Sequence, residues 1–254
     1  MSANLQEEFA TRGYTVLPRA LDAGLCHSVR DFVLKALDPL LGPAEYEAET
    51  GYPGAPENLA AQGGQTPRRL LHAWSRSNLF AQLAQAPVVV QALQSLLSAP
   101  VVMSQCHHNC VMTKHPGYSS ATLWHQDIRY WSFDRPELIS AWFALGHEHR
   151  TNGALRVIPS SHQLDLDRGA LDRDLFLRPD LSENKQLIRQ AVDVEMQAGD
   201  VLLFHCRLFH AAGTNRSEKV KISPVFTYHA QDNQPIPGTR SAAYPGVPMA
   251  SENV

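Results

Sequence analysis

Three residues have the types and the spacing of a mononuclear iron site. His125 and Asp127 lie in the run Trp124-His125-Gln126-Asp127, and His210 lies far downstream. Two imidazoles and one carboxylate occupy one face of an octahedral ferrous ion and leave three positions open. Residues i and i+2 of a β-strand point to the same side, so we expect His125 and Asp127 on one strand to share the metal while Gln126 faces away. His210 must then come from a second strand that lies nearby.

Composition bounds the class of protein. The chain has 254 residues, of which 44% are hydrophobic and 19% charged, as in a globular protein with a substantial core. The net charge of −3 gives no indication of a nucleic-acid or anionic-membrane partner. The polar, acidic start of the chain does not resemble a secretory signal, and no apolar run approaches the roughly 18 residues of a membrane span. We therefore expect a soluble, cytoplasmic protein that acts on a small molecule; the sequence indicates no oligomeric state.

The chain divides into a helical front (residues 1–99), a β-rich body (about 100–230) and a tail (231–254). In the front, apolar residues at helical spacing predict helices over 5–11, 23–37, 78–85 and 88–97, with a short strand over 14–17. Residues 42–66 show no periodicity and form either a mobile lid or a plain surface loop. Because no linker or repeat interrupts the chain, we expect one domain over 1–254.

The body consists of short apolar runs separated by turn residues. These runs predict strands over 101–114, 138–145, 154–158, 187–196, 201–205 and 219–228, with the charged segment 165–184 as an excursion from them. Many short strands at this spacing favour a β-sandwich or barrel, and a double-sheet jelly roll is one standard solution. The sequence therefore predicts a mainly β fold with flanking helices (α+β).

Cysteine and the remaining histidines are expected to be structural. Four cysteines are too few for a disulfide scaffold, and we expect reduced thiols. The run CHHNC at 106–110 has the residue types of a zinc cluster. It nevertheless alternates like a strand, and no second ligand pair with zinc spacing follows, which favours buried free cysteines. Structural roles are likewise expected for His147, His149, His162 and His205.

Four motifs in a fixed order carry a resemblance to a known family. They are WHQDIRYW at 124–131, NGALRVIPSSH at 152–162, GDVLLFH at 199–205, and His210 followed by NRS at 215–217. Together they resemble the phytanoyl-CoA dioxygenase family of Fe(II)- and 2-oxoglutarate-dependent oxygenases, over about residues 5–230. The resemblance implies a cupin-like double-stranded β-helix. It also implies that 2-oxoglutarate chelates the iron, that O2 takes the last position, and that decarboxylation to succinate and CO2 drives hydroxylation of a C–H bond.

The resemblance assigns the metal ligands to His125, Asp127 and His210. The family's arginine anchor for 2-oxoglutarate falls on Lys221, which carries the charge but not the bidentate fork of a guanidinium. Ser223, on the same strand face, can add a hydroxyl. The alternative is that Lys221 is a solvated strand lysine, with Arg216 or Lys219 as substitutes. Further family positions for contacts with the cosubstrate fall on Lys114, Cys110, Trp142 and Arg69, with a plain core aromatic as the alternative for Trp142.

The side of the site that would receive the substrate is the least determined. Arg129, Tyr130 and Trp131 follow the metal pair and are candidates for the pocket wall, with Arg129 facing an anionic group. Relatives that halogenate carry a small residue in place of the carboxylate, so the presence of Asp127 favours hydroxylation. Two other hypotheses stay open: a cupin-like protein that binds metal or senses 2-oxoglutarate without oxidative turnover, and a non-metal binding module with structural histidines.

Overall fold

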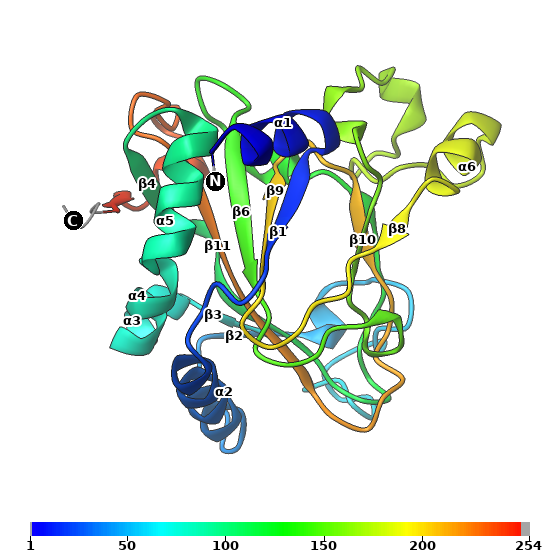
Figure 1. Cartoon of the computed structure of the whole chain (residues 1–254). Helices are drawn as coiled ribbons and strands as arrows, with labels where there is room; N and C mark the ends of the chain where they lie inside the picture. Colours follow the sequence, from blue (N-terminus) through cyan, green and yellow to red (C-terminus); the bar gives the residue numbers. More distant parts are fainter. Residues whose placement is uncertain (1, 250–254) are drawn as a thin grey trace.

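Two antiparallel β-sheets form the body of the protein. The computed structural model describes residues 2–249, and Figure 1 shows their course. The larger sheet has the strand order β1-β9-β6-β11-β4-β3-β2, with β12 paired to β4, and the smaller has the order β5-β10-β7-β8. The strands span β1 Tyr14–Leu17, β2 Ala44–Tyr46, β3 Pro67–Leu71, β4 Val101–Lys114, β5 Thr122–His125, β6 Leu138–Phe143, β7 Leu155–Val157, β8 Val192–Asp193, β9 Val201–His205, β10 His210–Ala212, β11 Lys221–Ala230 and β12 Val247–Pro248.

The helices between residues 2 and 97 share a core with the larger sheet, on the side away from β10 and β8, whereas the helix at 182–188 lies beside β8 (Figure 1). Asp22 caps the N-terminus of α2 by accepting a hydrogen bond from the backbone N–H of Leu25 at 3.0 Å. Pro87 occupies the first turn of α5, where its missing N–H has no intrahelical partner to lose. The helices span α1 Ser2–Arg12, α2 Ala23–Leu37, α3 Ala73–Arg76, α4 Asn78–Ala84, α5 Pro87–Leu97 and α6 Ser182–Ile188.

The larger sheet is buried on both faces. On β9, Val201 and Leu203 belong to the core shared with the helices, whereas Leu202 and Phe204 belong to a second cluster that includes Leu155 of the smaller sheet. Burial on both faces explains why this strand reads as a continuous apolar run rather than an alternating one. The second cluster supports the floor of the site described below.

The long elements predicted from the sequence are confirmed, and two details are corrected. Residues 187–196 do not form one strand: α6 ends at Ile188, and β8 covers Val192–Asp193 alone. Leu187 and Ile188 pack as a helical pair against the cluster containing Phe209, which a strand could not do with adjacent side chains. The apparently structureless 42–66 segment contains β2 and a 3-10 turn, Glu47–Glu49. The last five residues of the predicted tail lie outside the described residues.

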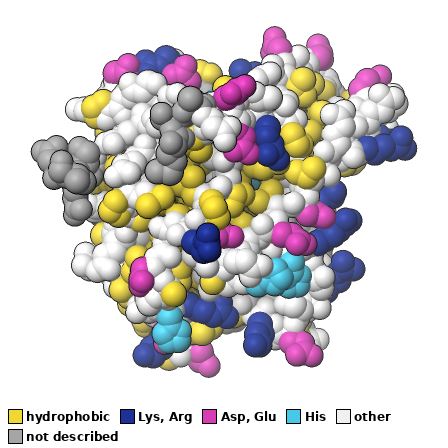
Figure 2. Space-filling model, viewed as in Figure 1, with side chains coloured by type: hydrophobic (Ala, Val, Ile, Leu, Met, Phe, Trp, Pro, Cys, Tyr) yellow, Lys and Arg dark blue, Asp and Glu magenta, His cyan; other side chains and the backbone are white. Residues whose placement is uncertain are grey.

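The surface matches the modest net charge. On the face shown in Figure 2, acidic and basic side chains are interspersed rather than segregated. None of the helices between residues 2 and 249 has the length and the apolar character that a membrane crossing requires.

Candidate active site

The three predicted metal ligands converge from separate parts of the chain. His125 ends β5 and His210 begins β10, and antiparallel pairing of these strands sets the two residues opposite each other. Asp127 Oδ1 lies 3.6 Å from Nε2 of His125 and 3.5 Å from Nε2 of His210. One ligand atom from each residue lies within 4.8 Å of the others, and all three residues are buried. The geometry is that of a facial triad around one small cation.

The local backbone differs from the predicted single strand. β5 ends at His125, Gln126 is extended, and Asp127 begins a 3-10 turn, Asp127–Tyr130. The turn forms because the N–H of Ile128 donates to the carbonyl of Cys206, in the connection before β10, rather than continuing a strand ladder. The extended Gln126 still leaves His125 and Asp127 on the same side, so the expected juxtaposition survives this correction.

Backbone carbonyls set the tautomer of both histidines. Nδ1 of His125 lies 2.8 Å from the carbonyl oxygen of Leu123, and Nδ1 of His210 lies 3.1 Å from that of Leu208. A carbonyl can only accept, so each Nδ1 carries the hydrogen and each Nε2 presents a lone pair toward Asp127. Burial, reinforced by the neighbouring His210, lowers the pKa of His125 to about 3, which keeps that imidazole neutral. Neutral Nε2 atoms are the donors that a metal requires.

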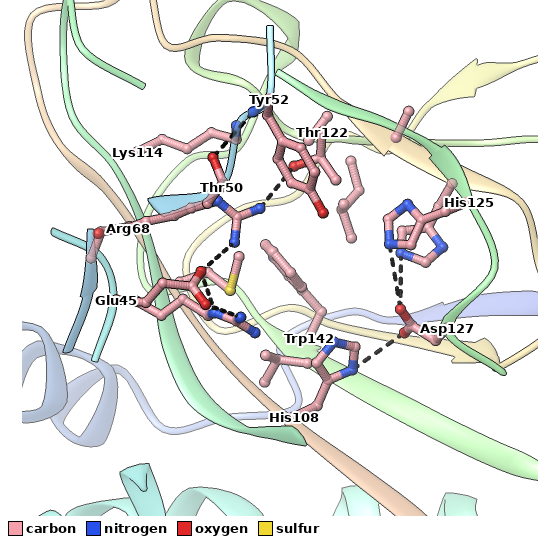
Figure 3. Close-up of a pocket in the computed structure, with 18 of the residues that line it drawn as sticks. Glu45, Thr50, Tyr52, Arg68, His108, Lys114, Thr122, His125, Asp127 and Trp142 are labelled. Carbon is pink, nitrogen blue, oxygen red and sulfur yellow. Dashed lines mark hydrogen bonds and ion pairs between the residues drawn. The ribbon is translucent and has the colours of Figure 1, made fainter. Parts of the chain in front are cut away.

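Asp127 has one satisfied and one free oxygen. Its Oδ2 accepts from the hydroxyl of Ser140 at 3.2 Å and lies 3.3 Å from Nδ1 of His108, whereas its buried Oδ1 has no hydrogen-bond partner within residues 2–249. Burial by itself would raise the pKa of Asp127, but His108, His210 and His125 outweigh it and hold that pKa below its usual value. An unpartnered buried carboxylate oxygen is costly unless a cation meets it. The donor set therefore fits a divalent metal ion (Figure 3).

His108 is a part of this site that the sequence did not reveal. It lies on β4, inside the CHHNC run, and meets Ser140 of β6 because β4 and β6 both pair with β11. Ser140 donates to Asp127, so His108 and Ser140 meet the same carboxylate. Its Nδ1 also lies 3.4 Å from the hydroxyl of Thr227 and 3.5 Å from that of Ser140. No spacing rule links a histidine to an aspartate nineteen positions away, so only the strand pairing could have identified it.

A cavity of about 230 Å³ opens beside the triad. Most of the residues predicted to contact cosubstrate or substrate line it: Arg69, Lys114, Arg129, Tyr130, Trp142 and Lys221. Cys110 and Ser223 are fully buried just behind the lining, and Trp131 packs instead with Cys106, Phe133 and Leu138. Several residues that sequence reasoning missed also line the cavity, among them Glu45, Tyr52 and Arg68, which come from β2, β3 and the loop between them (Figure 3).

Most cations of the cavity wall already have partners. Arg68 and Arg69 both bind the carboxylate of Glu45, with Arg68 Nη1 and Arg69 Nε at 3.1 and 2.8 Å from Oε1. Lys114 Nζ donates to the carbonyl of Ser120 at 2.7 Å, and its side chain runs so close to Gly153 that a Cβ there would lie 2.6 Å from Lys114 Cδ. Burial, with Lys221 close by, lowers the pKa of Lys114 to about 7.

Lys221 is buried, so the alternative of a solvated strand lysine is wrong. Its Nζ lies 3.1 Å from Glu148 Oε2 and 3.0 Å from the hydroxyl of Ser223, which in turn donates to Glu148 Oε1 at 2.6 Å. The indole N–H of Trp142 is 3.1 Å from both oxygens of Glu148. The suggested substitutes, Arg216 and Lys219, are exposed and are not part of the cavity lining.

Arg129 stands apart from the other cations of the wall. Its guanidinium lies over the ring of Phe176 at 4.0 Å and near that of Tyr130 at 5.1 Å. Its buried Nη1 has no hydrogen-bond partner among the described residues. Phe176 belongs to the predicted excursion, which returns to the site because Phe176 forms an isolated β-bridge with His125. Tyr52 packs edge-on against the same ring.

Comparisons with known proteins agree with this site. "Probable phytanoyl-CoA dioxygenase" of Caenorhabditis elegans is 28% identical over 159 residues, which cover 58% of this chain and 49% of that protein. EctD from S. alaskensis, solved with 2-oxoglutarate and 5-hydroxyectoine, superposes with a TM-score of 0.76 at 21% identity, covering 98% of this chain and 85% of that one. The epimerase SnoN, solved with Fe3+, alpha ketoglutarate and nogalamycin RO, superposes with a TM-score of 0.72 at 20% identity, covering 98% of this chain and 95% of that one.

These likenesses establish the fold and the family. The superpositions confirm the predicted jelly roll. The chain spans about half, or less, of the length of the curated relatives that it matches first. A family model described as Phytanoyl-CoA dioxygenase (PhyH) matches residues 9–223. Because that match covers well over half of the chain, the protein belongs to the phytanoyl-CoA dioxygenase family.

Proposed function

We propose that the protein is an Fe(II)- and 2-oxoglutarate-dependent dioxygenase that hydroxylates a C–H bond of a small molecule, with release of succinate and CO2. The observation that carries the proposal is the convergence of two imidazole Nε2 atoms and a carboxylate oxygen, unpartnered among the described residues, at a cavity lined with cations. The family membership supports it, as do the iron and 2-oxoglutarate named in the structures of SnoN and EctD.

His125, Asp127 and His210 would hold the iron. With 2-oxoglutarate and O2, the iron supplies the oxidising power for hydroxylation. The protein's own contribution is orientation: Ser140 and His108 fix the carboxylate of Asp127, and two backbone carbonyls fix the imidazoles. Asp127 occupies the position that halogenating relatives leave free for chloride, which favours hydroxylation.

The cosubstrate is a dianion, and its proposed binding wall is formed by Lys221, Lys114 and Arg69, with Trp142 beside Lys221. Ser223 and Cys110 support this wall from behind. Met112, which Cys110 contacts, completes the lining there. Because the lysines and arginines of the wall already have protein partners, binding of 2-oxoglutarate must exchange one set of polar contacts for another.

The part of the cavity around Arg129 would receive the substrate. Tyr52, Tyr130 and Phe176 enclose Arg129, and its unpartnered Nη1 suits a carboxylate or another anionic group. We propose a small-molecule substrate that carries such a group.

All four cysteines are buried and free, which supports the expected reducing, cytoplasmic setting.

Succinate formation tests the proposal directly. We expect the Fe(II)-loaded protein to convert 2-oxoglutarate to succinate, and His125→Ala to abolish this together with metal binding. Arg216→Ala serves as the control, because Arg216 is exposed and does not line the cavity of the site. Turnover that survives in His125→Ala would remove the metal assignment.

The second candidate is a protein that senses 2-oxoglutarate without oxidative turnover. Lysine rather than arginine at position 221 is the feature that favours it, because an ammonium lacks the bidentate fork of a guanidinium. Tight binding of 2-oxoglutarate with no succinate from any tested substrate would move the assignment to this function.

A further inference from the structure

We propose that Glu148 is an internal competitor for the cosubstrate: its carboxylate occupies the anchor that the distal carboxylate of 2-oxoglutarate would use. This inference rests on the proposed function and deepens it. The residues expected to grip the distal carboxylate are Lys221 and Ser223, with Trp142 beside them. All three are hydrogen-bonded to Glu148 at 2.6 to 3.1 Å. A carboxylate of the protein thus holds the contacts that a carboxylate ligand needs.

The competitor is built into the fold. The backbone of Glu148 is fixed by two hydrogen bonds with Met196, from Glu148 N–H at 2.8 Å and to its carbonyl at 3.0 Å. The residue is 1% exposed, so its charge has no access to solvent as an alternative to Lys221. A buried carboxylate is stable only when it is paired, which makes this contact a specific one.

The surroundings leave room for the carboxylate to move. Glu148 and Lys221 both line a second cavity, of about 550 Å³, whose lining includes none of the three proposed metal ligands. His147, His149 and Arg30 also line that cavity and offer polar partners there. Rotation of the Glu148 side chain toward this space would release Lys221 without disturbing the backbone pairing with Met196.

Competition follows from simple electrostatics. Two carboxylates at one ammonium repel each other in a buried site, so the distal carboxylate gains the full interaction with Lys221 only when Glu148 leaves. The wild-type protein should therefore bind 2-oxoglutarate more weakly than its cation count suggests. A 2-oxo acid without the distal carboxylate, such as pyruvate, needs no such displacement.

Calorimetric titration of the full-length, Mn(II)-loaded protein tests the inference. We expect Glu148→Gln to tighten binding of 2-oxoglutarate about tenfold, equivalent to about 1.4 kcal/mol, and to change pyruvate binding less than about twofold. Asp193→Asn is the matched control, because it removes the same charge from a carboxylate that pairs with Arg156 outside the cavity lining. It should change 2-oxoglutarate binding less than about threefold.

The outcomes separate the inference from the proposed function. Unchanged or weaker 2-oxoglutarate binding by Glu148→Gln would show that Glu148 merely holds Lys221 in place, and the inference would fall while the function stands. An equal tightening in Asp193→Asn would show a general effect of the lost negative charge and would overturn it equally. If neither 2-oxoglutarate nor pyruvate binds to wild type or Glu148→Gln, the proposed function fails and the inference with it.

A second measurement does not depend on the stability of Glu148→Gln. Because the indole of Trp142 donates to Glu148, displacement of that carboxylate changes the surroundings of Trp142. Addition of 2-oxoglutarate to the wild-type protein should change tryptophan fluorescence, pyruvate should not, and Trp142→Phe should lack the change. An equal response to both acids would refute displacement.

Discussion

Replacement of His108 by leucine tests whether a residue outside the triad orients the metal ligand. His108 lies on β4, and its Nδ1 is 3.3 Å from Asp127 Oδ2, whereas the other carboxylate oxygen, Oδ1, is the one that would face the metal. Leucine keeps comparable bulk in a site where the His108 side chain is 13% exposed, but it removes the polar contact. The carboxylate then retains only the hydroxyl of Ser140 as a partner for Oδ2.

The size of the effect can be estimated from this contact. A hydrogen bond to a charged group contributes about 1.5 to 3 kcal/mol, and loss of an outer partner of a metal ligand typically weakens metal binding by about 10- to 100-fold. The 3.3 Å separation is long for a charge-assisted bond, and Ser140 remains in place. We therefore expect the lower end of that range, about a tenfold loss of metal affinity for His108→Leu.

Anaerobic titration with Fe(II) provides the measurement, and His229→Leu provides the control. His229 is also a buried imidazole, hydrogen-bonded to the carbonyl of Ala230 and tilted by 56° against the ring of Phe133, and within residues 2–249 no hydrogen bond, ion pair or ring contact joins it to the triad. The control variant should lose stability without losing metal affinity. Equal affinities for His108→Leu and wild type would refute the orienting role, and equal losses in both variants would show a general effect of removing a buried histidine.

Three further predictions concern the substrate, pH and stability. Arg129→Met should raise the KM for a carboxylate-bearing substrate at least about tenfold, and that for a neutral analogue much less, in steady-state assays. The metal-free protein should lose stability as pH falls from about 6.5 toward 3: burial lowers the pKa of His125 and of His107 to about 3, so only the unfolded chain takes up these protons. The free energy of unfolding should fall by at most about 1.4 kcal/mol per pH unit for each histidine, and urea unfolding at pH 7 and 5 measures this fall. Tyr228→Phe should lower the free energy of unfolding by about 1 to 3 kcal/mol, because it leaves the carbonyl of Ala84 without its 2.9 Å donor; an unchanged urea midpoint would contradict this.

Elements with a strong local signal could be predicted from the sequence, and those defined by distant partners could not. The helix α2 and the strand β4 have the predicted bounds because each carries its own periodicity over many residues. Short strands such as β2 and β8 consist of two or three residues, and their pairing partners rather than their composition make them strands. The same reason explains the error at 187–196, where packing against Phe209 decided in favour of a helix.

The residues of the site fall into the same two groups, those with a local sequence signal and those placed by distant partners. The proposed metal ligands could be predicted because a His-x-Asp pair in an extended segment presents both side chains to one side, and because the family resemblance assigned His210 as the third ligand. His108 and Glu148 reach the site through strand pairing and through a loop held by Met196, so neither has a local signature. Arg129 was expected beside an anionic group, but only the structure places it over Phe176 with a buried, unpartnered nitrogen.

The presence of lysine rather than arginine at position 221 is consistent with an internal carboxylate partner. An ammonium has three N–H donors, and here one carboxylate and one hydroxyl engage two of them, whereas a guanidinium has five donors in a rigid fork. A single glutamate, with the serine hydroxyl, therefore pairs with most of the N–H donors of a lysine but would leave several N–H donors of a buried arginine without an acceptor. Lysine at the position of the family's arginine anchor therefore fits a proposed cosubstrate site whose anchor is paired with Glu148. The affinity of that site depends on the pair rather than on Lys221 alone.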